Sequence, residues 1–421
     1  MTHLRDRSFY EAIAPREPPR RILDRDVDCD VCVVGGGYTG LSAALHLAEQ
    51  GREVVVLEAQ RIGAGASGRN GGQIVTGFSV NLTTIARNLG VLKAHMLWDL
   101  AEGSKSLLID TIERHGIACE MVRGYFFAAV KPRHMNELSE ELAAWEAFGY
   151  RHARMVTREA LPAIVASPGY VGGMFDVGGG HLNPLSYARG LARAAEARGA
   201  TIFEQTPVLA LKRGPRPVLN AQGGSVRANQ VLMCAPYLEG FLPEARGMVV
   251  PVTTHMLATE PLGAARAREL LPGNAAVSDC NAVLDYFRLS ADHRLLFGGG
   301  ASYWRTEASP SLVLMRRLRR VFPQLTDVAC EWVWGGQVAI TTSRLPFAGQ
   351  VEENIWFATG FSGQGVTLTG LVGKLMAEAA SGNSRGLEIL AGLRHRRFPG
   401  GALRTPLLAL AMAWYRLRDA L

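Results

Sequence analysis

The stretch Cys29–Leu57 reads CDVCVVGGGYTGLSAALHLAEQGREVVVL, and its pattern decides the fold. The short apolar run Cys29–Val34 predicts a strand that ends in glycines. Apolar residues at helical spacing follow over Leu41–Gln50, and Gly51 predicts the end of that helix. The second apolar run, Glu53–Leu57, is continuous rather than alternating, which is typical of a parallel sheet buried on both faces. The stretch therefore predicts a βαβ unit.

The glycines at the centre of this unit predict a dinucleotide site. Gly35–Gly40 reads GGGYTG, which matches the pattern G-x-G-x-x-G between a strand and a helix. Gly35 permits the tight turn, Gly37 lets the backbone approach a pyrophosphate, and Gly40 lets helix and strand pack closely. The helix N-terminus also offers unpaired N–H groups and a partial positive charge to phosphates.

An acidic residue completes the fingerprint. Glu58 ends the second strand and follows the first glycine of the motif by 23 residues (58 − 35), close to the expected spacing of about 20. Its carboxylate can accept hydrogen bonds from both ribose hydroxyls. Tyr38 and Thr39, which open the helix, and Ala59 and Arg61, which follow the acid, are expected to contribute to the same site.

Two further glycine-rich loops favour FAD over NAD as the cofactor. Gly63–Gln73 reads GAGASGRNGGQ and can bring several backbone N–H groups close to a flat ring and to phosphates. Gly360–Gly365 reads GFSGQG and opens a predicted helix over Val366–Ala380. Reduced flavin gains negative charge at its N1–C2 carbonyl edge, so it needs such donors. The candidate flavin contacts in these loops are Ser67, Arg69, Asn70, Gly71, Gly72, Gln73, Gly360, Ser362, Gly363, Gln364, Gly365 and Val366.

Other elements can be predicted from local signals. The first 25 or so residues contain Pro15, Pro18 and Pro19 and are expected to form an irregular lead-in. Asn183 and Pro184 predict the start of a helix that runs to about residue 198. Further strands are predicted at Thr201–Val208, Gln230–Cys234, Tyr286–Leu289, Arg294–Phe297 and Ile355–Thr359.

Composition and charge do not indicate a nucleic-acid partner. The 421 residues are 48% hydrophobic, which allows two or three domains with a large core. The formal net charge is +7, but most positive residues are scattered singly. The two arginine clusters, at 316–320 and 394–397, have the spacing of solvated helix faces. We therefore expect no binding to nucleic acid.

The cysteines favour a reducing, cytoplasmic compartment and no bound metal. Cys29 and Cys32 form a C-x-x-C pair, but no second pair completes a zinc site. Residues 1–19 carry charges without the apolar core of a signal peptide, and no apolar run is long enough to cross a bilayer.

The glycine-rich blocks together resemble the D-amino-acid-oxidase superfamily of FAD-dependent oxidoreductases, over about residues 27–385. GGGHLNPL at 178–185 and DCNAVLDYFRLSADHRLLFGGG at 279–300 carry the same resemblance. Within the superfamily the chain is most similar to gamma-glutamylputrescine oxidases. That similarity continues into the tail FPGGALRTPLLALAMAWYRLRDAL at 398–421, which lies outside the general superfamily pattern.

The resemblance implies an α/β fold with two domains around the isoalloxazine ring. One is a Rossmann-like FAD-binding domain of the glutathione-reductase type, and the other is a substrate domain with a large antiparallel sheet. The implied segments are 25–95, 172–238 and 331–385 for the FAD domain, 96–171 and 239–330 for the substrate domain, and 386–421 for the tail. The backbone of Val208 would contact the adenine side.

The resemblance also implies the chemistry. A gamma-glutamylated polyamine such as gamma-glutamylputrescine would be oxidised to an aldehyde, with release of ammonia and hydrogen peroxide. Some relatives attach FAD to a cysteine, but Trp334–Pro346 contains none and Cys330 falls too early, so FAD is expected to be non-covalent. Relatives also place a lysine near the flavin, whereas Arg294–Gly298 reads RLLFG. The electron acceptor, molecular oxygen or another, therefore stays open.

Three residues are candidates for the substrate side. Tyr286 and Arg288 are two apart in a predicted strand, so their side chains share one face. The guanidinium of Arg288 could hold the glutamyl carboxylate through two parallel hydrogen bonds, or could form a surface ion pair instead. His255 lies in another predicted strand and is a candidate to line the pocket.

Other readings of the whole chain also stay open. It could be an oxidase or dehydrogenase of another small amine or amino acid, an NAD-linked dehydrogenase, or a flavin-binding subunit of an assembly. The oligomeric state cannot be read from the sequence.

Overall fold

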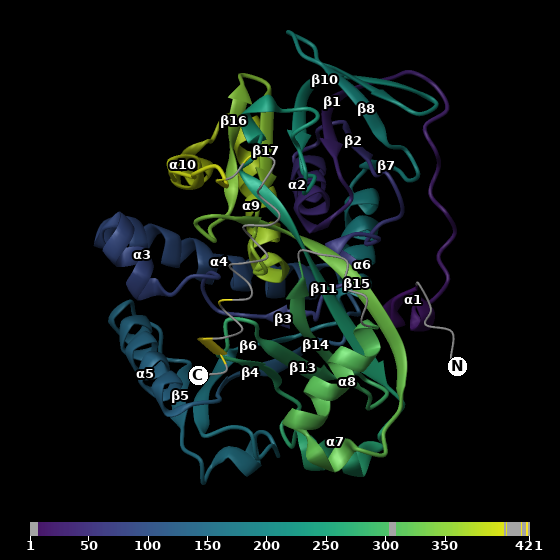
Figure 1. Cartoon of the computed structure of the whole chain (residues 1–421). Helices are drawn as coiled ribbons and strands as arrows, with labels where there is room; N and C mark the ends of the chain where they lie inside the picture. The colour runs from purple at the N-terminus through teal and green to yellow at the C-terminus, as the bar shows by residue number, and fades with distance from the viewer. Residues whose placement is uncertain (1–6, 303–308, 400, 402–413, 415–417, 420–421) are drawn as a thin grey trace.

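Two β-sheets form the framework of the molecule, a computed structural model that describes residues 7–302, 309–399, 401, 414 and 418–419. Figure 1 shows one sheet in the upper half of the view and the other in the lower half, with helices packed around both. The predicted α/β class, with a Rossmann-like unit and a second large sheet, is confirmed.

The upper sheet contains the predicted βαβ unit. Within the described residues it has eight strands, and five of them run parallel in the order β17-β10-β1-β2-β7. Its strands are β1 (Val27–Val34), β2 (Val54–Leu57), β7 (Thr201–Phe203), β8 (Val208–Lys212), β9 (Val218–Ala221), β10 (Gly224–Met233), β16 (Phe347–Glu352) and β17 (Ile355–Thr359). Every residue of β2 and β17 is buried, as their continuous apolar sequences predict.

Helices on this sheet bring two N-termini to the same region. They are α2 (Tyr38–Glu49), α4 (Val91–Arg114), α6 (Pro184–Ala197) and α9 (Gly365–Ala380). The predicted start of α6 is confirmed, because the Asn183 side chain accepts a 3.2 Å hydrogen bond from the N–H of Ser186. α2 and α9 pack very closely: a Cβ added at Gly373 would lie 2.3 Å from the carbonyl oxygen of Thr39.

The lower sheet has nine strands in the described residues, in the order β15-β11-β14-β13-β12-β4-β6-β3 with β5 beside β6. Every pairing is antiparallel except that of β4 with β12. The strands are β3 (Gln73–Ile74), β4 (Val122–Ala129), β5 (Ala153–Val156), β6 (Gly172–His181), β11 (Val249–Thr259), β12 (Ala276–Asp279), β13 (Asp285–Leu289), β14 (Leu295–Ser302) and β15 (Cys330–Thr341).

Two helices cover one face of this lower sheet. Leu314 and Leu318 of α8 (Pro310–Val321) and Leu270 of α7 (Ala264–Leu270) pack with Phe287 and Phe297 of the sheet in one core cluster. The opposite face of the same strands meets the glycine-rich loops of the upper half. Further helices are α3 (Leu82–Leu89), α5 (Pro132–Ala147) and α10 (Arg385–Ala391).

The sheet boundaries do not coincide with the segments implied for the two domains. β3, β6 and β15 pair within the lower sheet, although their residues fall in segments assigned to the FAD domain. The physical reason is that these strands leave the FAD loops and continue directly into antiparallel pairing. Assignment of the segments to the two domains therefore stays a prediction.

The expected irregular lead-in contains a helix. α1 (Phe9–Ile13) starts at a capping box, in which the side chain of Ser8 accepts from the Glu11 N–H and the Glu11 side chain accepts from the Ser8 N–H. Phe9 and Tyr10 are each only 1% exposed, so α1 is anchored in the core. Most of the tail from Thr405 onward lies outside the described residues.

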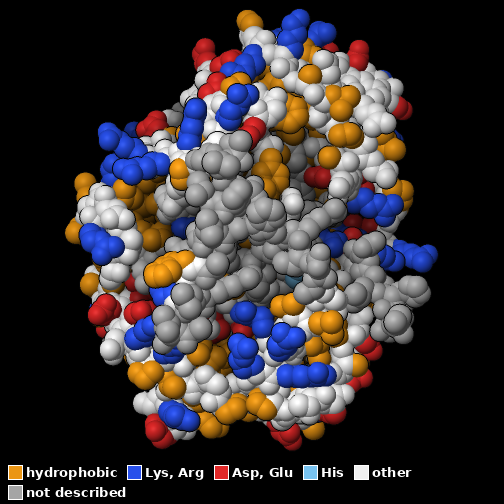
Figure 2. Space-filling model, in the orientation of Figure 1, with side chains coloured by type: hydrophobic (Ala, Val, Ile, Leu, Met, Phe, Trp, Pro, Cys, Tyr) orange, Lys and Arg blue, Asp and Glu red, His pale blue; other side chains and the backbone are white. Residues whose placement is uncertain are grey.

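Several expected absences can be examined in the described part of the chain. There, no helix is long and apolar enough to cross a membrane. The same residues contain no cluster of three or more His, Cys, Asp or Glu arranged to hold a metal ion. Figure 2 shows Lys and Arg distributed over several parts of the visible face, among Asp and Glu.

Candidate FAD site and active site

The acid of the fingerprint is tied to the glycine turn. Glu58 Oε2 accepts a 2.6 Å hydrogen bond from the N–H of Gly36, and Oε1 accepts a 2.8 Å bond from the N–H of Gln60. Burial raises the pKa of Glu58, and these two backbone bonds oppose that shift. Gly35 has a φ of 109°, and a Cβ at Gly40 would lie 2.0 Å from the carbonyl oxygen of Gly35. The motif therefore has the compact geometry that its glycines predict.

The start of α2 has backbone donors that no side chain of its own can cap. Gly37 is the N-cap residue, so the helix begins without a capping side chain. The N–H of Tyr38 donates to Ser67 Oγ at 3.1 Å, which ties the helix to the second glycine loop. Thr39 and Gly40 complete the first turn.

The start of α9 has the same property. The side chain of its N-cap residue, Gln364, makes no capping hydrogen bond. Gly363 has a φ of 96°, and an added Cβ there would meet no atom within 4 Å, so this end of the helix is open to a ligand. Ser362 is used differently: its Oγ donates to the Gly360 carbonyl and accepts from the Thr341 N–H, which fixes the loop to β15. Val366 is buried behind the loop.

The loop between β2 and β3 is held in a tight shape. The Asn70 side chain donates to the carbonyls of Ala66 and Ser67 and accepts from the N–H of Gly72. Gly72 has a φ of 70°, and a Cβ there would lie 1.9 Å from the carbonyl oxygen of Leu182. Only glycine fits this position.

Two other candidates in this loop have side chains that bind protein groups. Arg69 Nε donates to the Gly335 carbonyl at 2.7 Å, and Nη1 pairs with Glu11 at 3.2 Å. The amide of Gln73 donates to the Val277 carbonyl at 3.0 Å. Any contribution of Gln73 to the cofactor would therefore come from its backbone.

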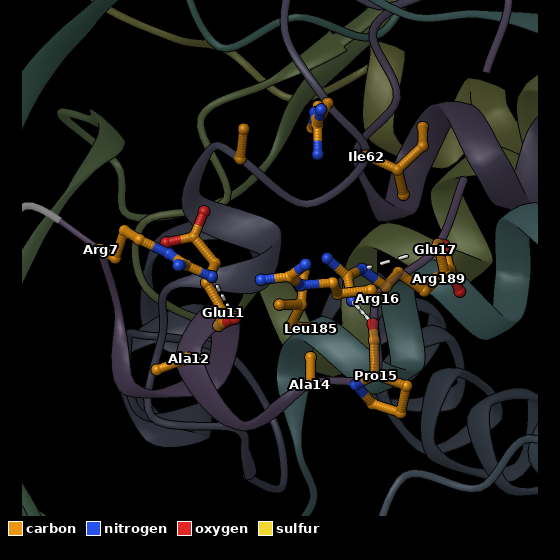
Figure 3. A pocket seen from close by; sticks show the side chains of 12 residues that line it. Arg7, Glu11, Ala12, Ala14, Pro15, Arg16, Glu17, Ile62, Leu185 and Arg189 are labelled. Atoms are coloured by element: carbon orange, nitrogen blue, oxygen red, sulfur yellow. Dashed lines mark hydrogen bonds and ion pairs between the residues drawn. The ribbon is translucent and has the colours of Figure 1, made fainter. Parts of the chain in front are cut away.

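Two cavities border the residues that follow Glu58. The first, of about 430 Å³, is lined by Arg7, Arg16, Arg61 and Arg189 together with residues of the N-terminal segment, and Figure 3 shows it from close by. The second, of about 770 Å³, is lined by Ala59, Arg61 and Pro207 among others. Because Pro207 precedes Val208, the second cavity lies where the adenosine end of FAD is expected.

These residues fit FAD. Two helix N-termini without capping side chains can receive negative charge, and an acid stands at the end of β2. Gly63 and Gly68 show the same close packing as Gly72, since a Cβ at Gly68 would lie 2.1 Å from the Gly63 carbonyl. The donor set therefore agrees with a dinucleotide that carries a ring.

The structure brings Tyr286 and Arg288 together on the face of β13 that meets the glycine loop. A Cβ at Gly71 would lie 2.9 Å from the Tyr286 ring, which packs over this glycine. Burial raises the pKa of Tyr286, so the phenol stays protonated at neutral pH.

The guanidinium of Arg288 binds groups of the protein itself, whereas the sequence suggests the carboxylate of a substrate as its partner. It is 2% exposed, and it donates from Nε to the Gly71 carbonyl at 2.7 Å, from Nη1 to the Leu289 carbonyl at 3.0 Å and from Nη2 to Tyr10 Oη at 3.3 Å. The alternative of a surface ion pair is excluded by this burial. These contacts favour a bracing role for the guanidinium over direct contact with substrate.

His255 does not lie on the same face of the lower sheet as the other two candidates, and its place in the substrate pocket stays a prediction from the sequence. Burial lowers its pKa. On the neighbouring strand β15, a Cβ at Gly336 would lie 3.7 Å from the Cβ of Arg69 in the glycine loop, whereas a Cβ at Gly335 would lie 3.2 Å from the His255 ring. Successive side chains of a strand point to opposite faces. His255 therefore faces away from Tyr286 and Arg288, on the side where Leu257 packs under α8.

Sequence reasoning missed residues whose contacts are distant along the chain. Tyr10 and Trp334 both donate to the loop before Gly71, and Gly373 permits the close approach of α2 and α9. The capping box at Ser8 and Glu11 was a readable signal for the helix that carries Tyr10. No local pattern marks Trp334.

Comparisons with known proteins agree with this site. The sequence profile of the FAD dependent oxidoreductase family (DAO) matches residues 30–379. The chain is 40% identical to the gamma-glutamylputrescine oxidoreductase of Escherichia coli (strain K12), over 98% of each chain. It is 38% identical to the probable oxidoreductase OrdL of Haemophilus influenzae (strain ATCC 51907 / DSM 11121 / KW20 / Rd), over 93% of this chain and 92% of the relative.

A solved structure supports the fold independently. The glycine oxidase of Geobacillus kaustophilus superposes with a TM-score of 0.71 at 23% identity, covering 85% of this chain and 95% of that one. This likeness concerns the fold, in which the loops around Gly35–Gly40, Gly63–Gln73 and Gly360–Gly365 come together. The chain belongs to the family of FAD dependent oxidoreductases.

Proposed function

We propose that this enzyme oxidises the primary amine of a gamma-glutamylated polyamine such as gamma-glutamylputrescine. The observation that carries the proposal is the 40% identity, over 98% of both chains, with a gamma-glutamylputrescine oxidoreductase. The uncapped N-termini of α2 and α9 and the glycine loop between β2 and β3 support a flavin rather than a nicotinamide cofactor.

The proposed reaction balances without a metal or an acid–base pair. Bound FAD would supply the acceptor for the hydride that leaves the carbon next to the amine. The nitrogen lone pair then forms a C=N bond, water adds to it, and ammonia leaves, which gives the aldehyde. Molecular oxygen can take the two electrons and become hydrogen peroxide. The protein has to orient the amine and keep it neutral.

Two side chains are proposed to face the substrate region. Tyr286 would form an aromatic wall over Gly71, since its ring packs on that glycine. Arg288 lies two residues away on the same face. Its role as the anchor of the glutamyl carboxylate stays a prediction from the sequence, and its burial weighs against it.

Anaerobic reduction of the bound flavin tests the proposed substrate. Gamma-glutamylputrescine should bleach the flavin much faster than free putrescine, glycine or proline at equal concentration. Faster bleaching by glycine or proline would assign a different substrate. Reduction by none of these amines would favour a flavin-binding subunit without its own active site.

Two possible roles of Arg288 can be distinguished by comparing the effect of one substitution on two substrates. If it anchors the carboxylate, Arg288→Ala should cost roughly 2–5 kcal/mol with the glutamylated amine and little with the free diamine. If it braces the loop, both substrates should lose equally and FAD should dissociate more readily. Steady-state constants for the two amines on both proteins decide between these roles.

FAD is proposed to be bound without a covalent link. Cys330 is the first residue of β15 and precedes Gly335, whose carbonyl contacts the glycine loop, and Trp334–Pro346 contains no cysteine. Acid precipitation should release all yellow colour into the supernatant, and flavin retained in the pellet would contradict this. The free state of all six cysteines also supports a cytoplasmic location.

A further inference from the structure

In the loop between β2 and β3, nearly all carbonyl groups of the segment 66–72 point toward the protein and accept hydrogen bonds. Of the seven residues Ala66–Gly72, six have carbonyl oxygens that accept a hydrogen bond. The Asn70 side chain supplies two of these bonds, to Ala66 and Ser67. The N–H of Leu182 supplies the bond to Gly72 at 2.8 Å. The other three come from side chains distant in sequence.

Three consecutive carbonyls are held by three different elements. The Trp334 Nε1–H, on β15, donates to Arg69 O at 2.9 Å. The Tyr10 hydroxyl, on α1, donates to Asn70 O at 3.0 Å. Arg288 Nε, on β13, donates to Gly71 O at 2.7 Å. We call Tyr10, Arg288 and Trp334 the carbonyl clamp.

The members of the carbonyl clamp also hold one another. Arg288 Nη2 donates to the hydroxyl of Tyr10 at 3.3 Å, so that hydroxyl accepts from one member while it donates to the loop. The rings of Tyr10 and Trp334 meet edge to face with centroids 5.4 Å apart. All three side chains are buried, with exposed fractions of 1–3%. Such buried, mutually bonded donors fix the loop far better than isolated ones.

The fixed carbonyls dictate where the amides point. A trans peptide is planar, so its C=O and the following N–H point in opposite directions. Holding the carbonyls of Arg69 and Asn70 therefore turns the N–H groups of Asn70 and Gly71 away from the clamp. Among the described residues these two N–H groups have no hydrogen-bond partner. These two N–H groups therefore follow carbonyls that are held in place, and they stay available as donors.

We propose that Trp334 and Tyr10 are positioning residues, which orient the Asn70 and Gly71 amides for the bound FAD. Arg288 supports them, because it donates to the Tyr10 hydroxyl and holds the next carbonyl, that of Gly71. The short N-terminal helix α1 is thereby part of the cofactor site, although the family profile begins only at residue 30. The proposal rests on FAD binding and is independent of which amine is oxidised.

Tyr10→Phe tests the clamp with the removal of one oxygen atom. The ring and its packing remain, while the Asn70 carbonyl loses its donor. The Kd for FAD, measured by fluorescence titration of the apoprotein, should rise roughly fivefold to tenfold. The absorption spectrum and the reduction potential of the bound flavin should shift, because the amides are no longer fixed.

Tyr170→Phe is the matched control. Tyr170 is equally buried, but it packs in the cluster under α8, and its hydroxyl has no partner among the described residues. This variant should keep the wild-type Kd, spectrum and potential. If Tyr10→Phe matches Tyr170→Phe in all three measurements, the clamp proposal is rejected.

A second pair of variants tests the carbonyl clamp if Tyr10→Phe fails to fold. Trp334→Phe removes the indole donor and keeps an aromatic ring, whereas Trp98→Phe makes the same change in a different aromatic cluster. Trp334→Phe alone should raise the Kd for FAD and shift the flavin spectrum. None of these readouts uses an amine, so they can succeed even if gamma-glutamylputrescine proves not to be the substrate.

Discussion

Glu58 shows how one carboxylate can organise a binding site. It accepts from Gly36 within the glycine turn and from Gln60 after β2, so the turn and the following loop are tied through its two oxygens. The sequence predicts this residue well, since its spacing from the first glycine follows from one βαβ unit. The partners of Arg288 could not be predicted, because Gly71 and Tyr10 lie 217 and 278 residues away along the chain.

Glu58→Gln should weaken FAD binding while preserving the fold. The amide has the shape of the acid but loses the charge that strengthens hydrogen bonds to the ribose, a loss of about 2 kcal/mol or roughly thirtyfold in Kd. Fluorescence titration of the apoprotein measures the change. Glu53→Gln, just before the opposite end of the same strand, is the control and should leave Kd unaltered. Equal values for the two variants would contradict the assigned role.

Asp279 should make stability depend on pH. Its side chain, on β12, is 6% exposed, and burial together with the charge of Asp285 raises its pKa to about 7. Because the pKa in the folded protein exceeds the ordinary aspartate value of 3.8, the stability contributed by this group is complete below about pH 4 and is lost as the pH rises through about 7. Asp279→Asn should therefore be more stable than wild type at pH 8, by roughly 2 kcal/mol, and should lose this advantage toward pH 5.

Urea unfolding of both proteins at pH 5 and pH 8 measures the effect of Asp279. A stability difference between variant and wild type that is the same at both pH values would show that the carboxyl does not titrate in this range.

Single elements differ in how far the sequence predicts them. β2 and β17 are continuous apolar runs and are found where expected. The run Thr201–Val208 instead divides, because β7 ends at Phe203 and β8 begins at Val208 in a separate hairpin with β9. Turn residues between them carry hydrogen bonds to Glu58 and Gln60, which no local pattern announces.

The close packing of α2 against α9 predicts that a larger residue at Gly373 lowers the stability of the protein. Gly373→Ala would place a Cβ 2.3 Å from the Thr39 carbonyl, so the helices must separate, with a loss of roughly 1–3 kcal/mol in unfolding free energy. Both helix N-termini would shift, so FAD affinity should also fall. Thermal unfolding and FAD titration measure the two losses.

Gly103→Ala is the matched control on α4. An added Cβ there meets no atom within 4 Å, so this change should raise stability by about 0.5–1 kcal/mol through helix propensity. If Gly373→Ala is as stable as the wild type, α2 and α9 can accommodate the added methyl group and the prediction is wrong.

At the scale of the whole molecule, the sequence predicts that one sheet is parallel and the other antiparallel, but it does not predict which strands each sheet contains. Continuous apolar strands identify the parallel sheet, and alternating segments identify the second one. The sequence does not show that β3, β6 and β15 cross from FAD loops into the second sheet, because strand pairing partners depend on contacts distant along the chain. The face of the sheet on which His255 lies could not be predicted either, since it is set by the pairing of β11.

The proposed chemistry predicts a pH dependence for the whole reaction. An alkylammonium titrates near pH ~10, as lysine does, and only the neutral amine has the lone pair that hydride loss requires. The rate of anaerobic flavin reduction should rise across the alkaline range until the bound amine is neutral. Stopped-flow measurements from pH 7 to pH 10 follow this rise. A flat profile would count against amine oxidation.

The carbonyl clamp has a consequence for how the enzyme matures. Its donors stand at residues 10, 288 and 334, so a growing chain has made the entire βαβ fingerprint long before the last support of the glycine loop leaves the ribosome. Cofactor loading should accordingly be a late event, completed on the finished polypeptide. Arrested nascent chains that end before β13 should retain little FAD, although they already contain Gly35–Gly40 and Glu58.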